Sequence, residues 1–198
     1  MTNSQLKLEA EQMIENADLP RLFEDYEAWF VGGSYSYDLM CWRDLDVYVL
    51  DPQHDLQRCF EIGYELTRRL SAKKARFTDS LGSEPDGLYW GIKLGDERQG
   101  AWKLDVWFLN SRGYRQHADY CAVMSERLTA EHRSAILEIK EAYWRRPEYR
   151  DTITSDLIYR AVIDHGVRTT GDFQHFLAGP PGQQQSFIKP SELTVGDS

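Results

Sequence analysis

Two aspartates are placed by type and spacing to do chemistry in this chain. Asp44 and Asp46 alternate with the aliphatic residues of the segment 44–50, which predicts a strand with both carboxylates on one face. Their Cα atoms would lie roughly 7 Å apart. Carboxylates this close raise each other's pKa, and a hard divalent cation such as Mg²⁺, which takes oxygen ligands, relieves the repulsion.

A second segment, 103–109, repeats this alternation and supplies a third carboxylate. Lys103, Asp105 and Trp107 alternate with three apolar residues, which again predicts a strand with one polar face. If the two strands lie in one sheet with their apolar faces on the same side, Asp105 joins Asp44 and Asp46. We therefore expect three aspartates to converge.

A glycine turn precedes the first of these strands. Gly32, Gly33 and Ser34 follow an apolar entry, and nine residues separate Ser34 from Asp44. Glycine lets a backbone adopt positive φ and come close to a ligand. A helix over 34–40 would direct free N–H groups and the positive end of its dipole at a phosphate. The turn is thus an expected anion site beside the metal site.

Together these motifs resemble the nucleotidyltransferase superfamily of the DNA polymerase β type. The resemblance rests on Gly33-Ser34, the nine-residue gap, Asp44-Leu45-Asp46 and Leu104-Asp105-Val106. The fuller string 29–39, with Arg43 directly before Asp44, looks more particularly like the small aminoglycoside and lincosamide nucleotidyltransferases. The resemblance is good over residues 25–110 and loose beyond them.

The resemblance implies an α/β fold, with a mixed twisted sheet flanked by helices and followed by C-terminal helices that often help to hold the acceptor. It also implies two-metal phosphoryl transfer. Asp44 and Asp46 would bind both Mg²⁺ ions, or Mn²⁺ in their place. Asp105 would bind the ion next to the incoming hydroxyl and help to deprotonate it.

The resemblance further implies that a nucleoside monophosphate, AMP in the first instance, moves from a nucleoside triphosphate to a hydroxyl of a small-molecule acceptor. That acceptor would be aminoglycoside- or lincosamide-like. The backbone of Gly32, Gly33 and Ser34 would hold the β- and γ-phosphates, and Arg43 and Lys103 are candidate charge neutralisers.

Other residues that could carry chemistry have simpler interpretations. Tyr48 and Trp107 share the predicted active face, where they would either stack on a base or only pack. The three cysteines lack a CxxC spacing, which favours buried small hydrophobes in a reducing cytoplasm. The four histidines outside the helix 155–165 have no metal-ligand spacing and are expected at the surface: His54, His117, His132 and His175.

The remaining pattern predicts the elements that must position the site. The segment 1–112 would form the catalytic core, 113–178 a helical region, and 179–198 a flexible tail. The helix 54–70 would pack through an apolar stripe formed by Leu56, Cys59, Phe60, either Tyr64 or Gly63, Thr67 and Leu70. Helices are predicted over 4–17, 54–70, 114–127, 130–144, 155–165 and 170–177, and strands over 27–31, 44–50, 75–78, 88–94 and 101–109.

Composition and net charge restrict the classes of molecule that this chain is expected to bind. The 198 residues, 41% hydrophobic and 28% charged, are typical of a globular protein. The net charge of −9 argues against nucleic acid and favours a cationic or neutral acceptor. No signal-peptide stretch and no run of eighteen apolar residues occurs, so we expect a cytoplasmic protein without a membrane partner. The sequence predicts no oligomeric state.

Three other functions compete with small-molecule modification. An Asp-x-Asp pair also occurs in sugar-nucleotide glycosyltransferases of another fold, although there it normally follows a strand. Minimal nucleotidyltransferases that modify proteins usually carry an arginine three residues after the serine, where this chain has Tyr37. A nucleotide-binding module without activity would also share the fold, but the presence of all three aspartates argues against it.

Overall fold

A five-stranded mixed sheet in the order β1-β2-β5-β4-β3 forms the centre of the protein. The computed structural model describes residues 1–179, so the predicted tail lies outside the described residues from position 180 on. β2 and β5 pair in parallel, and the other three pairs are antiparallel. The strands are β1 (Trp29–Val31), β2 (Asp44–Leu50), β3 (Lys74–Asp79), β4 (Gly87–Lys93) and β5 (Lys103–Leu109).

The alternation in β2 decides which face of the sheet is buried. Leu45, Val47 and Val49 have no exposed surface, and the polar residues between them are half-buried. In β5, Leu104, Val106 and Phe108 are buried on the same side. These six side chains belong to one apolar core, which also includes side chains of three helices that cover this face.

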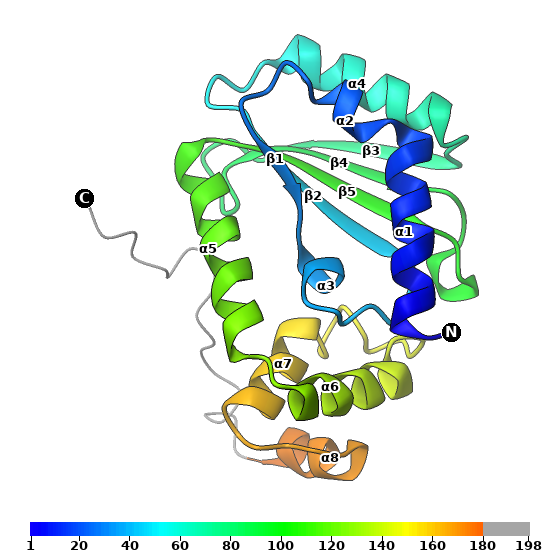
Figure 1. Ribbon diagram of the computed structural model, residues 1–198, viewed down its shortest axis with the longest axis vertical. Coiled ribbons are helices and arrows are strands. Elements are labelled where there is room, and N and C mark those ends of the chain that lie inside the picture. Colours follow the sequence, from blue (N-terminus) through cyan, green and yellow to red (C-terminus); the bar gives the residue numbers. More distant parts are fainter. Residues whose placement is uncertain (180–198) are drawn as a thin grey trace.

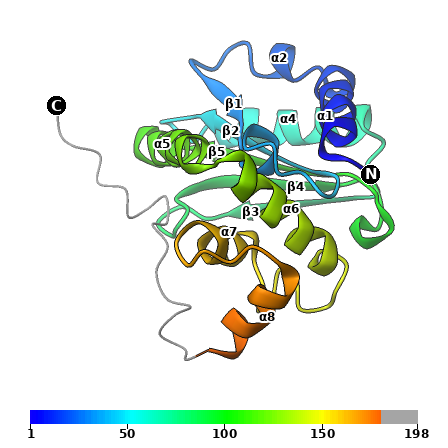
Figure 2. The ribbon, with the colours of Figure 1, turned by 60° about the horizontal axis from the view of Figure 1, so that its bottom comes forward.

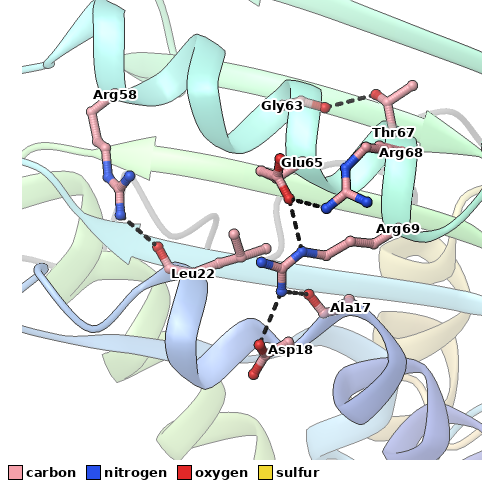
Figure 3. Close-up of polar contacts among 9 residues, drawn as sticks. All are labelled: Ala17, Asp18, Leu22, Arg58, Gly63, Glu65, Thr67, Arg68 and Arg69. Carbon is pink, nitrogen blue, oxygen red and sulfur yellow. Dashed lines mark hydrogen bonds and ion pairs between the residues drawn. The ribbon is translucent and has the colours of Figure 1, made fainter.

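The covering helices are α1 (Asn3–Ala17), the short α2 (Leu19–Leu22) and α4 (Leu56–Arg69). Figure 1 shows α2 and α4 on one side of the sheet. Arg69 of α4 ties this layer together: its guanidinium donates to Asp18 Oδ2 at 3.0 Å, to the Ala17 carbonyl at 3.2 Å and to Glu65 at 3.0 Å (Figure 3). The junction between α1 and α2 is thereby fixed to the end of α4.

The predicted apolar stripe of α4 was partly wrong. The side that faces the sheet carries Cys59, Ile62, Gly63 and Leu66, whereas Leu56, Phe60 and Tyr64 are 50%, 45% and 65% exposed. Gly63 explains the difference, because a Cβ at this position would overlap the indole ring of Trp90 on β4. The helix therefore brings its glycine close to the sheet, while Phe60 contacts Phe77 of β3 and Trp90 of β4 with part of its ring exposed.

Four helices follow β5 and lie beyond the other face of the sheet (Figure 1). They are α5 (Ser111–Arg127), α6 (Ala130–Tyr143), α7 (Ser155–Ile163) and α8 (Thr170–Ala178). Each begins after a side-chain N-cap, and the predicted cap at Thr129 is confirmed, with His132 completing a capping box. Figure 2 shows α8 on the side of the molecule remote from α2.

These helices have an apolar core of their own. Met124, Ile136, Ile139 and Ile158 are fully buried in it. This second core also takes in Tyr37, Leu39 and Trp42 from the segment between β1 and β2, so the first part of the chain contributes to both cores. The boundary expected at 112 and 113 falls between β5 and α5 and stays a prediction. Among residues 1–179, no helix has the length and apolar character needed to cross a membrane.

Candidate functional site

Strand register sets the geometry of the site. Asp46 on β2 pairs directly with Asp105 on β5, and Asp44 pairs with Lys103. Residues that are direct partners in neighbouring strands point to the same face, and this face is opposite the apolar core. The parallel pairing of β2 and β5 therefore gathers all three predicted carboxylates on one side of the sheet.

A lysine ammonium lies among these carboxylates. Lys103 Nζ is 3.7 Å from Asp44 Oδ1 and contacts Asp105 Oδ2. The other oxygen of Asp105 accepts a 2.6 Å hydrogen bond from the Tyr89 hydroxyl. Gly91 on β4, the strand partner of Asp105, leaves room for the phenol of Tyr89. A Cβ at this position would lie only 2.5 Å from the Tyr89 oxygen. Both oxygens of Asp105 are thus occupied by the protein.

Burial and mutual interaction shift the pKa values of the charged groups in this cluster. It raises the pKa of Asp44 to about 6, an effect that Lys103 partly offsets and Asp105 reinforces. Burial and the neighbouring Asp44 raise the pKa of Asp46 well above its usual value. Burial would lower the pKa of Lys103, but Asp44 and Asp105 outweigh it and raise that pKa instead. Asp44 Oδ1 is buried without a hydrogen-bond partner in the described part of the chain.

The glycine turn lies directly against Asp46. Gly33 has φ of +59°, and a Cβ at this position would overlap Asp46 Oδ2. The Gly32 amide donates to the Asp46 carbonyl at 2.9 Å. The helix expected over 34–40 is much shorter, because α3 spans only Gly33–Ser36 and Asp38 already has a positive φ. So short a helix has little dipole, and the turn offers only its own backbone amides to an anion.

A cavity of about 320 Å³ opens between this turn and the C-terminal helices. Its floor is the polar face of β2, and its other walls come from α3, the segment before β2, α5, α6 and α7. It is therefore built jointly by the sheet and the helices. The lining residues are Gly33, Ser34, Tyr37, Trp42, Asp44, Asp46, Tyr48, His117, Tyr120, Cys121, Lys140, Ser155, Asp156 and Tyr159.

Lys140 is a wall residue that the sequence interpretation missed. Its side chain is 1% exposed, and its ammonium donates to the Leu39 carbonyl at 2.7 Å and to the Tyr159 hydroxyl at 3.3 Å. An ammonium has three donors, so one remains for a ligand. A signal was present, because Lys140 follows Ile136 by four residues and Ile139 by one, on the apolar side of its helix.

His117 also lines the cavity, so its predicted surface position was wrong. Its Nδ1 donates to the Gly113 carbonyl at 2.9 Å, and its ring centroid is 4.5 Å from that of Tyr48. Burial lowers its pKa below the usual value. The imidazole is therefore neutral near pH 7 and presents Nε2 as a hydrogen-bond acceptor.

The cysteines divide between core and cavity. Cys41 and Cys59 are buried, as expected of small hydrophobic residues. Cys121 is half-buried on the cavity wall, where its Sγ lies 3.3 Å from the Tyr37 hydroxyl. No role in chemistry follows from this contact.

Arg43 has a different set of contacts from the one expected. Its guanidinium donates to Glu9 at 2.6 and 3.0 Å and to the Gly100 carbonyl at 2.8 Å. These bonds hold α1 and the turn between β4 and β5 together, and Arg43 does not line the cavity. Trp107 lies beside the cavity rather than in it, with its ring 4.5 Å from that of Tyr89.

The donor set bears on metal binding. Within residues 1–179, no three His, Cys, Asp or Glu side chains are arranged to hold a metal ion by themselves. A protein cation is present here instead, because the Lys103 ammonium lies 3.7 Å from Asp44 Oδ1 and contacts Asp105 Oδ2. Asp44 and Asp46 remain as two carboxylates that face the cavity.

Comparison with known proteins identifies the fold. No protein-family model and no curated protein sequence matches the chain. A solved structure of the Cid1 poly(U) polymerase with Mg 3′-dATP bound matches 82% of this chain and 48% of its own, at 16% identity and a TM-score of 0.56. A second Cid1 structure covers 82% and 47% at 17% identity, and a MgATP-bound mutant covers 80% and 49% at 15%, both with a TM-score of 0.55.

The chain spans about half the length of these structures, and identities this low show the fold alone. They give no support to the narrower likeness to antibiotic-modifying enzymes. A sugar-nucleotide glycosyltransferase would need another fold, so that alternative is removed. The predicted fold class is confirmed: a mixed five-stranded sheet with helices, in the fold of Cid1, a member of the pol β-type nucleotidyltransferase superfamily.

Proposed function

We propose that this protein is a Mg²⁺-dependent nucleotidyltransferase that moves a nucleoside monophosphate from a nucleoside triphosphate to a hydroxyl group. One observation carries the proposal. Asp46 and Asp105 are direct partners across β2 and β5, with Asp44 on the same face and Gly33 against the Asp46 carboxylate. The likeness in fold to a poly(U) polymerase supports this choice of reaction.

The carboxylates of β2 fit Mg²⁺. Asp44 Oδ1 is a buried oxygen without a hydrogen-bond partner among the described residues, and Asp46 lies beside it on the cavity floor. Mg²⁺ is commonly held by one or two carboxylates together with water and substrate phosphates, so a complete protein cage is not required. Such an ion would neutralise charge on the attacking and leaving oxygens. Asp105 and a second ion stay predictions.

The protein's own residues would bind and orient the triphosphate. The backbone of Gly33 and Ser34 lines the cavity next to Asp46, and Lys140 has one ammonium donor to spare. Lys103 adds a second cation at the carboxylates. The paired rings of Tyr48 and His117 offer a surface on which a base can stack. ATP is the first nucleotide to test, since solved Cid1 structures hold Mg 3′-dATP and MgATP.

The remaining alternative functions differ in the molecule that supplies the acceptor hydroxyl, or in having no acceptor at all. A small-molecule acceptor stays the expectation from the sequence. For a protein-modifying enzyme, an arginine would be expected where Tyr37 stands, and Tyr37 is buried against Cys121 instead. A silent nucleotide-binding module would keep the cavity without transfer.

A labelling experiment decides between these functions. Purified protein is incubated with α-labelled ATP and Mg²⁺, together with aminoglycosides, lincosamides, total cell protein or total RNA, and the position of the label is followed. We expect Asp46→Asn to abolish transfer while the thermal unfolding transition is kept, because Asp46 lies on the cavity floor. Asp79→Asn on the exposed end of β3 is the matched control. ATP binding without transfer to any acceptor would indicate the silent module, and full turnover by Asp46→Asn would exclude the proposed site.

A further inference from the structure

The exposed apolar side chains of α4 form a stripe along one side of this helix. Leu56, Phe60 and Tyr64 follow one another at intervals of four residues, and all three are exposed. Residues four apart on a helix are neighbours on its surface. With Gln57 and Glu61 they line a shallow groove. Clustered exposed apolar side chains, unlike single ones, mark interaction surfaces.

The two flanks of α4 have different neighbours. On one flank, Arg58 and Arg69 donate to backbone carbonyls at the ends of α2 and α1 (Figure 3). On the other flank, Phe60 contacts Phe77 of β3, with ring centroids 4.5 Å apart. β3 is the last strand on this side of the sheet. The apolar stripe therefore lies at the open edge of the sheet, away from α1 and α2.

The edge strand β3 has backbone groups that β4 does not use. The Ser80 amide donates to the Gly87 carbonyl across the ladder of β3 and β4. Hydrogen-bonded pairs alternate along an antiparallel ladder, so the even-numbered residues of β3 bond to β4. The odd-numbered residues direct their N–H and C=O groups away from the sheet: Ala75, Phe77 and Asp79. β1, the strand at the other edge, has only three residues.

A second copy of this edge would satisfy these outward groups. In a dimer with a two-fold axis perpendicular to the sheet, the two edge strands run antiparallel and one residue faces its own copy. With Phe77 at the axis, Ala75 pairs with Asp79 of the second copy. All three outward residues then form hydrogen-bonded pairs, with about six hydrogen bonds between the chains. With Arg76 at the axis, two guanidinium groups would be directly opposed, which is unfavourable.

The charges of β3 agree with this pairing. The strand carries Lys74 and Arg76 in its first half and ends at Asp79, so an antiparallel copy brings the acidic end beside the basic end twice. Arg76 faces Thr78 and Lys74 faces Ser80 of the second copy, so no like charges are directly opposed. A partner strand of a single charge sign would be favoured at only one end. The edge is therefore complementary to itself.

The spacing of the layers also agrees with a symmetric contact. α4 packs on both β3 and β4 and therefore lies above the gap between these two strands. Neighbouring strands are about 4.8 Å apart, which places two copies of α4 about 10 Å apart across the axis. Two helices pack directly at this distance. Each apolar stripe would then be covered by its copy, with Phe60 near the axis.

We propose that the protein forms a two-fold symmetric dimer in which the β3 strands pair about Phe77 and the apolar stripes of α4 pack together. The sheet then continues through ten strands, five from each chain. Among the described residues that line the cavity, none belongs to β3 or α4. The dimer thus leaves the cavity open and does not depend on the proposed function.

The mass of the intact protein in solution is the first test. One chain has a mass of 23.1 kDa, and sedimentation equilibrium should show twice this mass at micromolar concentration. Phe60→Glu should weaken dimerisation at least a hundredfold, because it places two charges near the axis. Leu8→Glu is the matched control, because it changes an exposed leucine on α1 and should dimerise like the wild type. A wild-type monomer at millimolar concentration, or equal weakening by both variants, would overturn the proposal.

Charge exchange tests the register without changing the apolar stripe. Ala75→Asp sets a carboxylate opposite Asp79 of the second copy at two symmetric positions and should weaken dimerisation roughly tenfold. Asp79→Lys should weaken it as well, because the new cation lies beside Lys74 and Arg76 of the second copy. A mixture of the two variants should form heterodimers in preference to either homodimer, because the introduced aspartate faces the introduced lysine. No preference for the heterodimer would exclude this register.

Amide hydrogen exchange distinguishes strand pairing from contact between helices alone. At equal concentration, the amides of Ala75, Phe77 and Asp79 should exchange at least tenfold more slowly in the wild type than in Ala75→Asp mixed with excess monomeric Leu8→Glu removed, that is, in the weakened variant alone. The even-numbered amides of β3 bond to β4 in either state and should change little. Circular dichroism establishes that each variant is folded. Fast exchange of the outward amides in a dimeric wild type would place the contact elsewhere and reject the pairing of β3.

Discussion

Lys103 places its ammonium group 3.7 Å from Asp44 Oδ1 while it also contacts Asp105. The two carboxylates come from different strands, so one protein cation joins β2 to β5 at the centre of the site. It supplies positive charge where a divalent ion is expected to bind. The ammonium thereby reduces the repulsion between the carboxylates of this face in the metal-free protein, and a metal bound there would compete with this lysine.

Replacing this lysine should therefore increase the dependence of stability on Mg²⁺. Lys103→Met leaves buried carboxylates without their partner, and we expect the free energy of unfolding to fall by roughly 1–3 kcal/mol in metal-free buffer at pH 7.5. Added MgCl₂ should restore more stability to this variant than to the wild type. Urea denaturation with and without MgCl₂ measures both effects, with exposed Lys73→Met as control. An unchanged midpoint in metal-free buffer would contradict this role of Lys103.

The raised pKa of Asp44 predicts how the metal-free protein responds to pH. Burial moves this pKa from 3.8 in the unfolded chain to about 6 in the folded protein. Between these values the folded state binds more protons, so this carboxyl destabilises the fold increasingly as the pH rises from about 4 to about 6. Asn mimics the neutral form. Asp44→Asn should thus be more stable than wild type at pH 7 by roughly 1–3 kcal/mol, and the difference should shrink at pH 4.5.

Urea midpoints at the two pH values, taken in the presence of a chelator, measure this difference directly. Because protons and Mg²⁺ compete for the same carboxylate, the stabilisation of wild type by MgCl₂ should be larger at pH 7 than at pH 4.5. Identical stability differences at both pH values would show that Asp44 titrates normally.

Tyr89 is expected to affect turnover more than nucleotide binding. Its hydroxyl donates to Asp105 at 2.6 Å, and it lies outside the cavity lining. Loss of a hydrogen bond that orients a metal-ligating carboxylate typically costs ten- to a hundredfold, and Asp105 is predicted to be such a ligand. Tyr89→Phe should lower kcat about tenfold and change the KM for ATP less than twofold. Tyr64→Phe is the control, because it removes the same hydroxyl group from an exposed tyrosine on α4. A change confined to KM would place Tyr89 with the nucleotide instead.

The two strands that carry the aspartates could be predicted closely because polar and apolar residues alternate strictly along them. Asp44–Leu50 is both the predicted and the observed strand, and β5 starts two residues inside its prediction. The register between the two strands could not be predicted, because no local sequence feature indicates that Asp46 pairs with Asp105 in a parallel arrangement. The spacing of the glycines predicted where the turn lies, but it did not predict the contact between Gly33 and the Asp46 carboxylate.

The helical wall of the site was beyond prediction for a different reason. Lys140 and His117 gain their roles from packing against Leu39 and Tyr48, which are about 70 to 100 residues away in the chain. A lysine on a helix is ordinarily solvated, so its burial follows only from the tertiary fold. On α4, the pattern left open whether Gly63 or Tyr64 faces the sheet, and the close approach of Gly63 to Trp90 decides it. Local patterns fix elements, whereas close contacts between elements decide which side chains face the cavity.

Arg69 and Arg68 provide a test of the polar contacts that hold the covering helices. Both pair with Glu65, but only Arg69 also reaches Asp18 and the Ala17 carbonyl across to the α1–α2 junction (Figure 3). Its side chain is 21% exposed, against 58% for Arg68. Arg69→Met should lower the free energy of unfolding by about 1–2 kcal/mol. Arg68→Met should leave the urea midpoint unchanged, and equal effects of the two would argue against the bridge.

Gly33 and Gly82 form a matched pair that separates backbone strain from the role of the turn. Both have positive φ, +59° and +77°, and therefore an alanine at either position is strained by about 1–2 kcal/mol. At Gly82 nothing lies within 4 Å of the added Cβ, whereas at Gly33 the Cβ would overlap Asp46 Oδ2 and displace the carboxylate. Gly33→Ala should therefore lose at least as much stability in urea denaturation as Gly82→Ala, which carries the backbone strain alone.

Their activities should differ. Gly33→Ala should lose at least a hundredfold in nucleotide transfer, because displacement of a positioned group by about 1 Å has an effect of this order. Gly82→Ala should transfer at the wild-type rate. Label transfer from ATP, measured well below both unfolding temperatures, provides the comparison. If Gly33→Ala transferred as fast as Gly82→Ala, the carboxylate would not need its present position against the turn, and the assignment of Asp46 to the metal would lose its geometric basis.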